Sequence, residues 1–551
     1  MQILQLEELK QLAKILDMRA ANKSRNLLAT GILAMRCSRQ TRLTYFAQPS
    51  FANRKSIAQE ATERIVQHGL KLAGPILRIP PMIRTRLDRL VALYFLETIS
   101  VGGLSEPVEA PIRSLGTAIL TDINRIKYPP YSIVRNRPVF MSRHHWEAYE
   151  EAIAYEKHTC QIVAELEEVT IDILEDLLED TKKKWQYTFT TGDILTDDVD
   201  KSLYFLQRYT PGWIYTRMLA AFVALLERAR AFFEANRILE MLLGQDKYCR
   251  GQRGKWWERL VLNSAAHLGL KEEAGCLIKK ALLDPHVRTA SKLALQRRQC
   301  KFSRTVFEPD QPPPTITIYA DPEDRRSTGK KLFYLLPSGL LGSVEELALA
   351  HYEQEGWSGV QSESRIYRML FALLFWDILF AEVPNVFQTP HQTAPLDLCT
   401  DAFYATRQDH IEDRLMLIAK GNAPQILVDA YYPHYGCQAI GVQWEEYPLS
   451  TLLDIIHSLG GSSLVPIMRE LAEDYAGSCS GLPDLLLYRP DRRDYLLVEV
   501  KSTRDRLSDA QRHWNAIFSQ HGVKYALCRV LDTSLEGEPV IKRSKRQQQR
   551  R

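Results

Sequence analysis

Leucines recur at helical spacing near the N-terminus, between residues 4 and 33. A polar turn at Asn22, Lys23 and Ser24 divides this stretch and predicts two short helices. Such a pair, with a cation at its turn, is typical of small DNA-contacting modules, and equally of a plain helical hairpin. From about residue 47 to 150 the pattern stays mostly helical, and a short strand is predicted at 131–134.

Amphipathic helices follow one another with short breaks between residues 151 and 302. This succession predicts antiparallel helix pairs stacked into a tetratricopeptide-like solenoid, although no regular repeat period is visible. The predicted helices with the clearest periodicity are 213–228, 231–243, 255–268 and 271–283.

The pattern changes after the proline-rich stretch EPDQPPP at 308–314, which predicts a linker over 303–340. Beyond it, helices and strands alternate, and this order predicts an α/β domain at 341–535. Helices are expected at 343–352, 365–380, 408–421 and 509–521, and strands at 485–488, 495–501 and 524–530.

The composition of the chain bears on its number of domains, its compartment and its cysteine chemistry. A chain of 551 residues exceeds the usual size of one hydrophobic core, so two to four domains are expected. The longest apolar stretch, 366–381, is interrupted by Arg368 and Asp377, which favours a buried helix over a membrane span. No secretory signal is recognised, and an intracellular protein is expected. The nine cysteines form no Cys-x-x-Cys pair, so a disulfide framework and the usual zinc sites are not supported.

The net charge of +4 is too small to indicate nucleic-acid binding by itself. The segment 536–551 is a basic tail with the cations of a nuclear import signal or a phosphate contact, or of a solvated chain end.

The strongest chemical signal is GLPDLLLYRPDRRDYLLVEVK at 481–501. Glu499 and Lys501 are two residues apart on a predicted strand and project from one side, while Val498 and Val500 project from the other. We therefore expect one apolar face and one charged face. The turn RPDRRD lies midway between Asp484 and Glu499, so a hairpin places the two carboxylates opposite each other, roughly 5 Å apart.

Facing carboxylates repel each other unless a cation lies between them. Mg²⁺ is typically held by one or two carboxylates together with phosphate and water. Lys501 beside the pair can set an ammonium against a developing phosphate charge. The motif thus predicts metal-dependent phosphodiester hydrolysis, whereas an isolated Glu-x-Lys would equally suit an exposed edge hairpin.

With these residues in place, the chain resembles the PD-(D/E)xK nuclease superfamily, in particular its VRR-NUC branch and the Fanconi-associated nuclease family. The matching blocks span the region from about residue 4 to 530, and the N-terminal helix pair looks like a SAP module within 1–150. The resemblance implies a restriction-endonuclease-like fold for the C-terminal domain. The blocks that carry it are YTPGWIYTRML (209–219), RGKWWERL (253–260), SVEELALAHYEQEGW (343–357), SESRIYRMLFALLFWDILF (362–380), PLDLCTDAFY (395–404) and GLPDLLLY (481–488).

The same resemblance implies the site. Glu363, at the start of a helix, corresponds to an upstream metal-binding glutamate expected to converge on Asp484 and Glu499, and Lys501 corresponds to the catalytic lysine. The Val500 carbonyl is expected as a further ligand of Mg²⁺ or Mn²⁺. Gln511 corresponds to another polar position of the family, but Ser508 and Gln511 also fit a helix capping box.

DNA contacts are expected from the cation group Arg250, Arg253, Lys255 and Arg259, for which a solvated face is equally plausible. Family members bind a 5′ phosphate in a basic pocket that is partly changed here: Lys255, Ser291 and Ala476 stand where an arginine, a histidine and an arginine are usual. Buried packing is expected of both Trp256 and Trp257.

The resemblance implies a metal-dependent structure-specific nuclease that cuts 5′-flap or branched DNA, with 5′ exonuclease-like action, in interstrand crosslink repair. A nuclear location, branched DNA and repair-protein partners, no membrane association and no small-molecule cofactor are expected with it. Two alternatives remain open: a junction-resolvase-type nuclease, and a non-catalytic helical scaffold that binds branched DNA and repair proteins.

Overall fold

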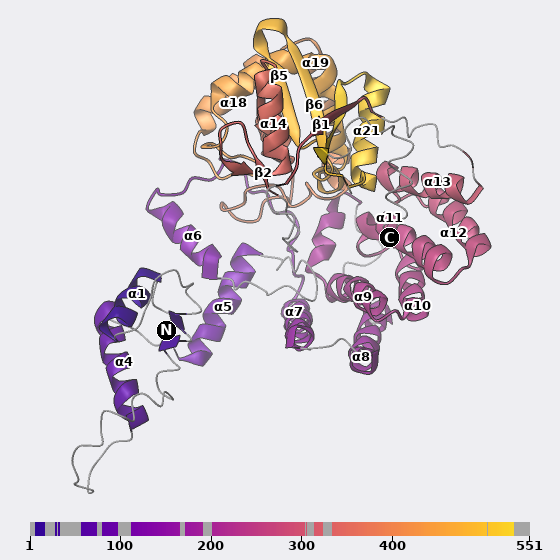
Figure 1. The fold of residues 1–551 in the computed structure, drawn as a ribbon. Coiled ribbons are helices and arrows are strands. Elements are labelled where there is room, and N and C mark those ends of the chain that lie inside the picture. Colours follow the sequence, from indigo (N-terminus) through magenta and orange to yellow (C-terminus); the bar gives the residue numbers. More distant parts are fainter. Residues whose placement is uncertain are drawn as a thin grey trace, which may run out of the picture. The chain divides into compact units, whose positions relative to one another are not determined.

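The structure, a computed structural model, describes most of the chain (Figure 1). The described residues divide into two compact units, Met1–Leu90 and Val91–Arg551, each of which is described by itself. The predicted N-terminal region 1–150 is therefore not one body. The described residues are 6–16, 28–29, 31–32, 57–73, 80–96, 112–165, 171–190, 201–303, 305, 313–322, 333–503 and 505–533.

The first unit contains a small helical core. Helix α1 (Leu6–Ile15) packs against α4 (Ile57–Ala73), and the boundary between the units falls within α5 (Pro81–Phe95). Leu9 and Leu12 of α1 are buried together with Leu28 and Ile65. The expected turn at 22–24 lies outside the described residues, so the SAP-like module stays a prediction.

Residues 112–142 belong to the second unit, and the predicted boundary at 150 stays a prediction. After α6 (Ile112–Asp122) the chain is irregular, and the strand predicted at 131–134 does not form. Instead, the Tyr131 ring stacks on Phe387 at 3.9 Å, and the Val134 carbonyl accepts a hydrogen bond of 2.7 Å from the Asn385 N–H. Loop contacts thus replace a partner strand.

The predicted solenoid is present: from α8 to α13 each helix packs against the next, while α7 packs against α9 (Figure 1). Thr210 caps α9, with Pro211 at its first position, and the buried face of α9 includes Met218 and Phe222. The helices predicted at 213–228, 231–243 and 271–283 are confirmed, while 255–268 divides into an α-helix and a π-helical turn. The elements are α7 (Arg143–Glu165), α8 (Ile171–Thr190), η2 (Lys201–Tyr209), α9 (Pro211–Arg228), α10 (Phe232–Leu243), η3 (Arg250–Gln252), α11 (Arg253–Leu262), η4 (Asn263–His267), α12 (Lys271–Leu283) and α13 (Thr289–Ser303).

The C-terminal part of the second unit is built on a five-stranded mixed sheet with the order β1-β7-β6-β5-β4. Strands β4, β5 and β6 are antiparallel, whereas β6, β7 and β1 are parallel. The predicted linker 303–340 is wrong in part, because it contains β1 and the hairpin strand β2; β4 was also not predicted. The strands are β1 (Thr315–Tyr319), β2 (Tyr334–Leu335), β3 (Leu341–Gly342), β4 (Ser358–Gln361), β5 (Leu485–Arg489), β6 (Asp494–Lys501) and β7 (Tyr525–Leu531).

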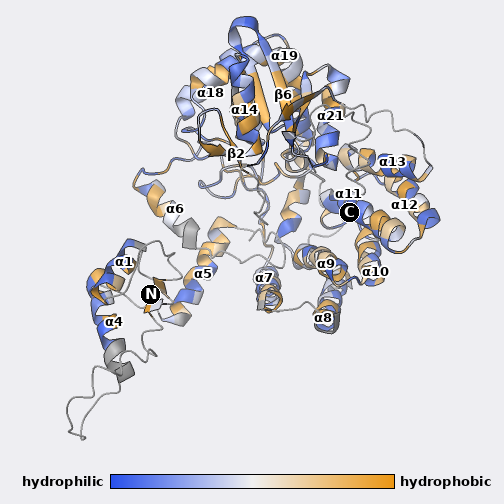
Figure 2. Cartoon of the chain, viewed as in Figure 1, coloured by the Kyte–Doolittle hydropathy of each residue, from blue (hydrophilic) through white to orange (hydrophobic). Residues whose placement is uncertain are grey.

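Helices cover both faces of this sheet. On one face, α14 (Val344–Gln354) shares a buried cluster with Val498 and Val500. On the other, α19 (Leu449–Glu473) and α21 (Asp509–His521) pack over Leu497. The predicted charged face is therefore wrong along most of β6, which is largely hydrophobic in Figure 2. A strand covered on both sides must be apolar on both sides, and only its end carries charge.

Most of the remaining helices pack against α19. The stretch 366–381 forms α15 (Arg365–Leu374) and α16 (Trp376–Leu379), buried as expected. By length and composition α19 alone among the described helices would suit a membrane span, but 56% of its apolar window is buried, as in a core helix. The others are α17 (Ala402–Ala419), α18 (Ala423–His434), α20 (Tyr475–Ser478) and η5 (Pro490–Arg492).

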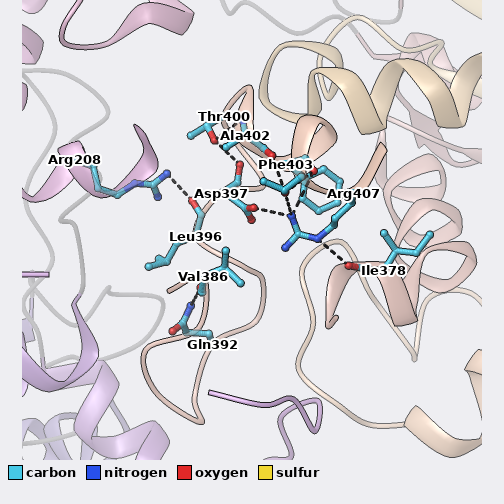
Figure 3. A network of polar contacts seen from close by, with 11 residues as sticks. Arg208, Ile378, Val386, Gln392, Leu396, Asp397, Thr400, Ala402, Phe403 and Arg407 are labelled. Atoms are coloured by element: carbon cyan, nitrogen blue, oxygen red, sulfur yellow. Dashed lines mark hydrogen bonds and ion pairs between the residues drawn. The ribbon is translucent and has the colours of Figure 1, made fainter. Parts of the chain in front are cut away.

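A polar network fixes the loop that joins α16 to α17 and ties it to the solenoid (Figure 3). Asp397 and Arg407 form a fully buried ion pair of 2.6 Å. One residue earlier, the Leu396 carbonyl accepts a hydrogen bond of 2.7 Å from Arg208 of η2. The solenoid and the α/β part are thus joined by specific contacts within one unit.

Candidate active site

The β5–β6 hairpin brings the two predicted carboxylates together. Leu485 pairs with Val498, and one step further this register sets Asp484 opposite Glu499, as the sequence predicted. The turn is made by η5 and by Arg493, which has a φ of 48°. An Asp484 carboxylate oxygen accepts a hydrogen bond of 2.8 Å from the Val500 N–H, which fixes the side chain against β6.

Glu499 is completely buried and its two carboxylate oxygens differ. Oε1 forms an ion pair of 2.7 Å with Lys501 and accepts a hydrogen bond from the Gln511 amide. Oε2 has no hydrogen-bond partner among the described residues. Burial and the neighbouring Asp484 charge raise the pKa of Glu499 to about 8, although Lys501 opposes the rise.

The pKa of Asp484 is raised as well. Burial raises its pKa, while the Val500 N–H and the Lys501 ammonium lower it. A fully buried and a half-buried carboxylate therefore share one ammonium, so the cluster lacks positive charge when both are ionised.

Gln511 belongs to a helix capping box and also contacts the acidic pair. Ser508 and Gln511 form a capping box at the start of α21, in which the Gln511 Oε1 accepts from the Ser508 N–H at 2.8 Å. The amide nitrogen of the same side chain donates to Glu499. The helix cap thus orients the amide toward the carboxylate.

Glu363 lies beside this cluster in the backbone, but its side chain does not join it. The Ser362 N–H donates to the Asp484 carbonyl at 2.8 Å, so β4 delivers the chain next to Asp484. Glu363 and Ser364 then take positive φ values of 29° and 70° before α15 begins. The Glu363 side chain is 63% exposed and lies 3.6 Å from Arg365.

Of the three acids expected to converge, only Asp484 and Glu499 therefore lie together. Within the described part of the chain, no group of three His, Cys, Asp or Glu side chains is close enough to share a metal ion. Glu363 as a third ligand stays a prediction.

Two residues around the pair were missed from the sequence. Tyr367 is buried in α15, and burial together with the charges of Glu499 and Asp484 raises its pKa. Ser362 is fully buried, and its hydroxyl donates to the Pro483 carbonyl. Their position within four residues of Glu363 was the available signal.

The residues present fit a hard divalent cation. Glu499 Oε2 is a buried oxygen without a hydrogen-bond partner in the described part of the chain, and Asp484 adds a second carboxylate. The N–H and C=O of a strand residue point to the same side, so the Val500 carbonyl also faces the Asp484 strand. Carboxylate and carbonyl oxygens are the ligands preferred by Mg²⁺ and Mn²⁺.

The four cations predicted to contact DNA differ in their exposure and in their ion-pair partners. Arg253 is buried, pairs with Asp284 at 2.7 Å and donates to the Leu243 carbonyl, so its predicted phosphate contact is wrong. The Arg250 guanidinium lies 4.7 Å from the centre of the Tyr204 ring. Lys255 and Arg259 are exposed, and Arg259 pairs with Glu227.

Trp256 and Trp257 are buried, as expected, at 5% and 9% exposure. The Trp257 indole donates to Asp284 at 2.9 Å. Neither ring offers a face on which an unpaired base could stack.

Two family models match the chain. The model described as the TPR domain of Fanconi-associated nuclease 1 matches residues 148–303, and that of the VRR-NUC domain matches 419–532. A Fanconi-associated nuclease 1 homolog from Arabidopsis thaliana is 35% identical over 443 residues, which is 77% of this chain and 48% of that protein. In its helical-repeat and nuclease regions the chain is similar to the Fanconi-associated nucleases.

Further comparisons define how far the family match extends. Fanconi-associated nuclease 1 from Homo sapiens is 32% identical over 566 residues, covering 95% of this chain and 54% of that protein. The chain thus spans about half the length of these curated relatives. A solved structure of paFAN1 bound to 2nt 5′ flap DNA with gap has a TM-score of 0.62 at 19% identity and covers 94% of this chain and 82% of that one. The fold is that of the Fanconi-associated nucleases.

Proposed function

We propose that this protein is a metal-dependent nuclease that hydrolyses phosphodiester bonds in branched DNA, notably 5′ flaps, and acts in interstrand crosslink repair. The observation that carries the proposal is the pairing of the fully buried Glu499 with the half-buried Asp484, with Lys501 at 2.7 Å from Glu499, in a chain that matches a nuclease domain. Two adjacent carboxylates, one of them fully buried, cost free energy, and a site for a cation explains why the pair is retained.

Asp484, Glu499 and the Val500 carbonyl would hold Mg²⁺ or Mn²⁺. Such an ion, when bound, lowers the pKa of a coordinated water and neutralises phosphate charge. Glu363 would join as a third carboxylate by rotation of its exposed side chain away from Arg365. The backbone next to it is already fixed by the hydrogen bond from Ser362 to Asp484.

The protein's own groups would prepare the site for the phosphate. Gln511 and Lys501 both engage Glu499 Oε1, which leaves Oε2 without a hydrogen-bond partner among the described residues. The Lys501 side chain is 13% exposed, so its ammonium can also face a phosphate oxygen or the attacking water.

The preference for flaps is proposed from the similar structures of paFAN1, which hold 5′ flap DNA. We infer both endonuclease and 5′ exonuclease-like action on such ends. Nuclear residence is proposed as well; the basic tail 536–551 lies outside the described residues. Deleting this tail from a fluorescent fusion and imaging its distribution tests that part.

The test of the function is a cleavage panel of end-labelled flap, splayed, nicked and four-way DNA, with EDTA, Mg²⁺ or Mn²⁺. Wild-type protein should cut flaps only with metal, and Asp484→Ala should bind DNA normally but lose cleavage. Preferential cutting of four-way DNA would favour a junction resolvase instead. Binding without cleavage by the wild type under any metal would favour a scaffold.

A further inference from the structure

A cavity of about 660 Å³ lies on the helical repeats and is lined by α9, α10, α11 and their ends. Helices α9 and α11 both pack against α10, which leaves a groove between them with α10 as its floor. The nuclease carboxylates take no part in its lining.

The wall from α9 is apolar and made of small side chains. Ala220, Val223 and Ala224 lie at i, i+3 and i+4 and so share one face of the helix. The two alanines leave space that larger side chains would fill. Leu239 and Phe232 of α10 continue this apolar surface at the floor.

The wall from α11 is cationic above an aromatic base. Lys255, Trp256 and Arg259 lie at i, i+1 and i+4, and all three line the groove. Trp256 is 5% exposed, so only an edge of the ring contributes to the surface. Lys255 and Arg259, in contrast, are exposed.

The groove has surplus positive charge. Its lining includes one acid, Glu227, which is already engaged by Arg259 and by the Asn263 amide at 2.8 Å. Arg228 and Lys255 also line it, are exposed, and have no ion-pair partner among the residues that the structure describes.

We propose that this groove is a docking site for a short acidic peptide segment of another protein, anchored by an aliphatic or aromatic side chain. The anchor would lie over Ala220 and Ala224, and the flanking carboxylates would meet Arg228 and Lys255. The proposal does not depend on nuclease activity.

A peptide suits this groove better than a nucleic-acid backbone does. A phosphodiester has no apolar group to cover Ala224 and Phe232, whose side chains are exposed and half-buried, and it would approach the Glu227 carboxylate. The buried Trp256 offers no face for base stacking. An acidic peptide with one apolar side chain satisfies both the floor and the rim.

The test measures binding of two fluorescein-labelled peptides to the full chain by anisotropy. One peptide has a central leucine between glutamates and aspartates, and the other has glycine in place of leucine. We expect the leucine peptide to bind at least about tenfold more tightly. Equal binding of the two would overturn the proposal, since charge alone would then explain it.

Variants locate the site. Arg228→Glu should weaken the leucine peptide by about tenfold or more, and Ala224→Leu should block it by filling the groove. Lys279→Glu makes the same charge change on an exposed position of α12, outside the lining, and should leave the affinity unchanged. Thermal melts verify that each variant is folded.

A labelled single-stranded oligonucleotide provides the competing outcome. If it binds the wild type, loses affinity in both groove variants and displaces the peptide, the groove is a nucleic-acid site and the proposal is wrong. An equal loss of peptide binding with Lys279→Glu would contradict it as well.

Discussion

Glu499 is a fully buried carboxylate whose neighbours set its protonation. Its pKa is raised by burial and by Asp484, and Lys501 only partly offsets this. Since the unfolded chain releases this proton at the ordinary value, the folded metal-free protein is penalised once Glu499 ionises.

The first prediction concerns stability without metal. The folded pKa lies above the unfolded one, so the wild type should lose stability as pH rises from 4.5 to about 8. The slope due to this group is about 1.4 kcal/mol per pH unit. Glu499→Gln removes this slope. In EDTA, the difference in unfolding free energy between the variant and the wild type should therefore grow with pH. Saturating Mg²⁺ should abolish the loss of stability with pH in the wild type. Parallel stability profiles of the wild type and Glu499→Gln in EDTA would contradict the prediction.

The second prediction concerns Lys501. Lys501→Met should lower kcat on a flap substrate by about a hundredfold or more while leaving DNA affinity nearly unchanged, because the ammonium acts on the reacting phosphate. Lys524→Met is the matched control: Lys524 pairs with Asp494 at the opposite end of β6 and is 57% exposed. Similar loss in both variants would show a general effect of sheet charge.

Among the elements, α14 and α21 begin with the same device. Ser343 with Glu346, and Ser508 with Gln511, form capping boxes that satisfy main-chain donors at the helix starts. Only the α21 box also contacts the carboxylate pair, through Gln511. One local motif therefore stabilises a helix in one place and orients a site residue in the other.

This pairing gives the third prediction. Ser508→Ala and Ser343→Ala should each cost about 1 kcal/mol of stability. Only Ser508→Ala should also weaken Mg²⁺ binding, because it frees the end of α21 that positions Gln511. Calorimetric titration of Mg²⁺ into both variants measures this affinity. An unchanged affinity in Ser508→Ala would show that the helix cap does not affect metal binding.

In the whole molecule, the solenoid and the α/β part share one buried cluster and are joined by charged contacts. Arg288, just before α13, pairs with Asp401 at 2.7 Å and with Asp474 at the start of α20. Arg297 of α13 pairs with Asp509 of α21 at 2.6 Å. The contacts from α13 thus reach the helix that carries Gln511.

The fourth prediction tests this junction. Arg288→Met should destabilise the second unit by about 1 to 3 kcal/mol, because Asp474 is only 16% exposed and loses its cation. Arg237→Met, which removes a surface pair with Glu234, should cost little. Limited proteolysis of the second unit should accelerate in the first variant only. Equal rates would show that apolar packing alone holds the parts together.

The sequence alone determined the solenoid helices, the hairpin and the apposition of Asp484 with Glu499. These depend on local periodicity and on a turn lying midway between the two acids, so nearby residues contain the information. The capping box of α21 was likewise visible from Ser508 and Gln511 alone.

Tertiary structure decided what depends on remote partners. Strands β1 and β4 are short and form only because β7 and β5 offer edges far along the chain, which hid β1 inside a predicted linker. The same pairing sets Glu363 beside Asp484 without fixing its side chain, and packing against Asp284 turned Arg253 from a surface cation into a buried one. Long-range contacts of this kind leave no periodic trace in a single sequence.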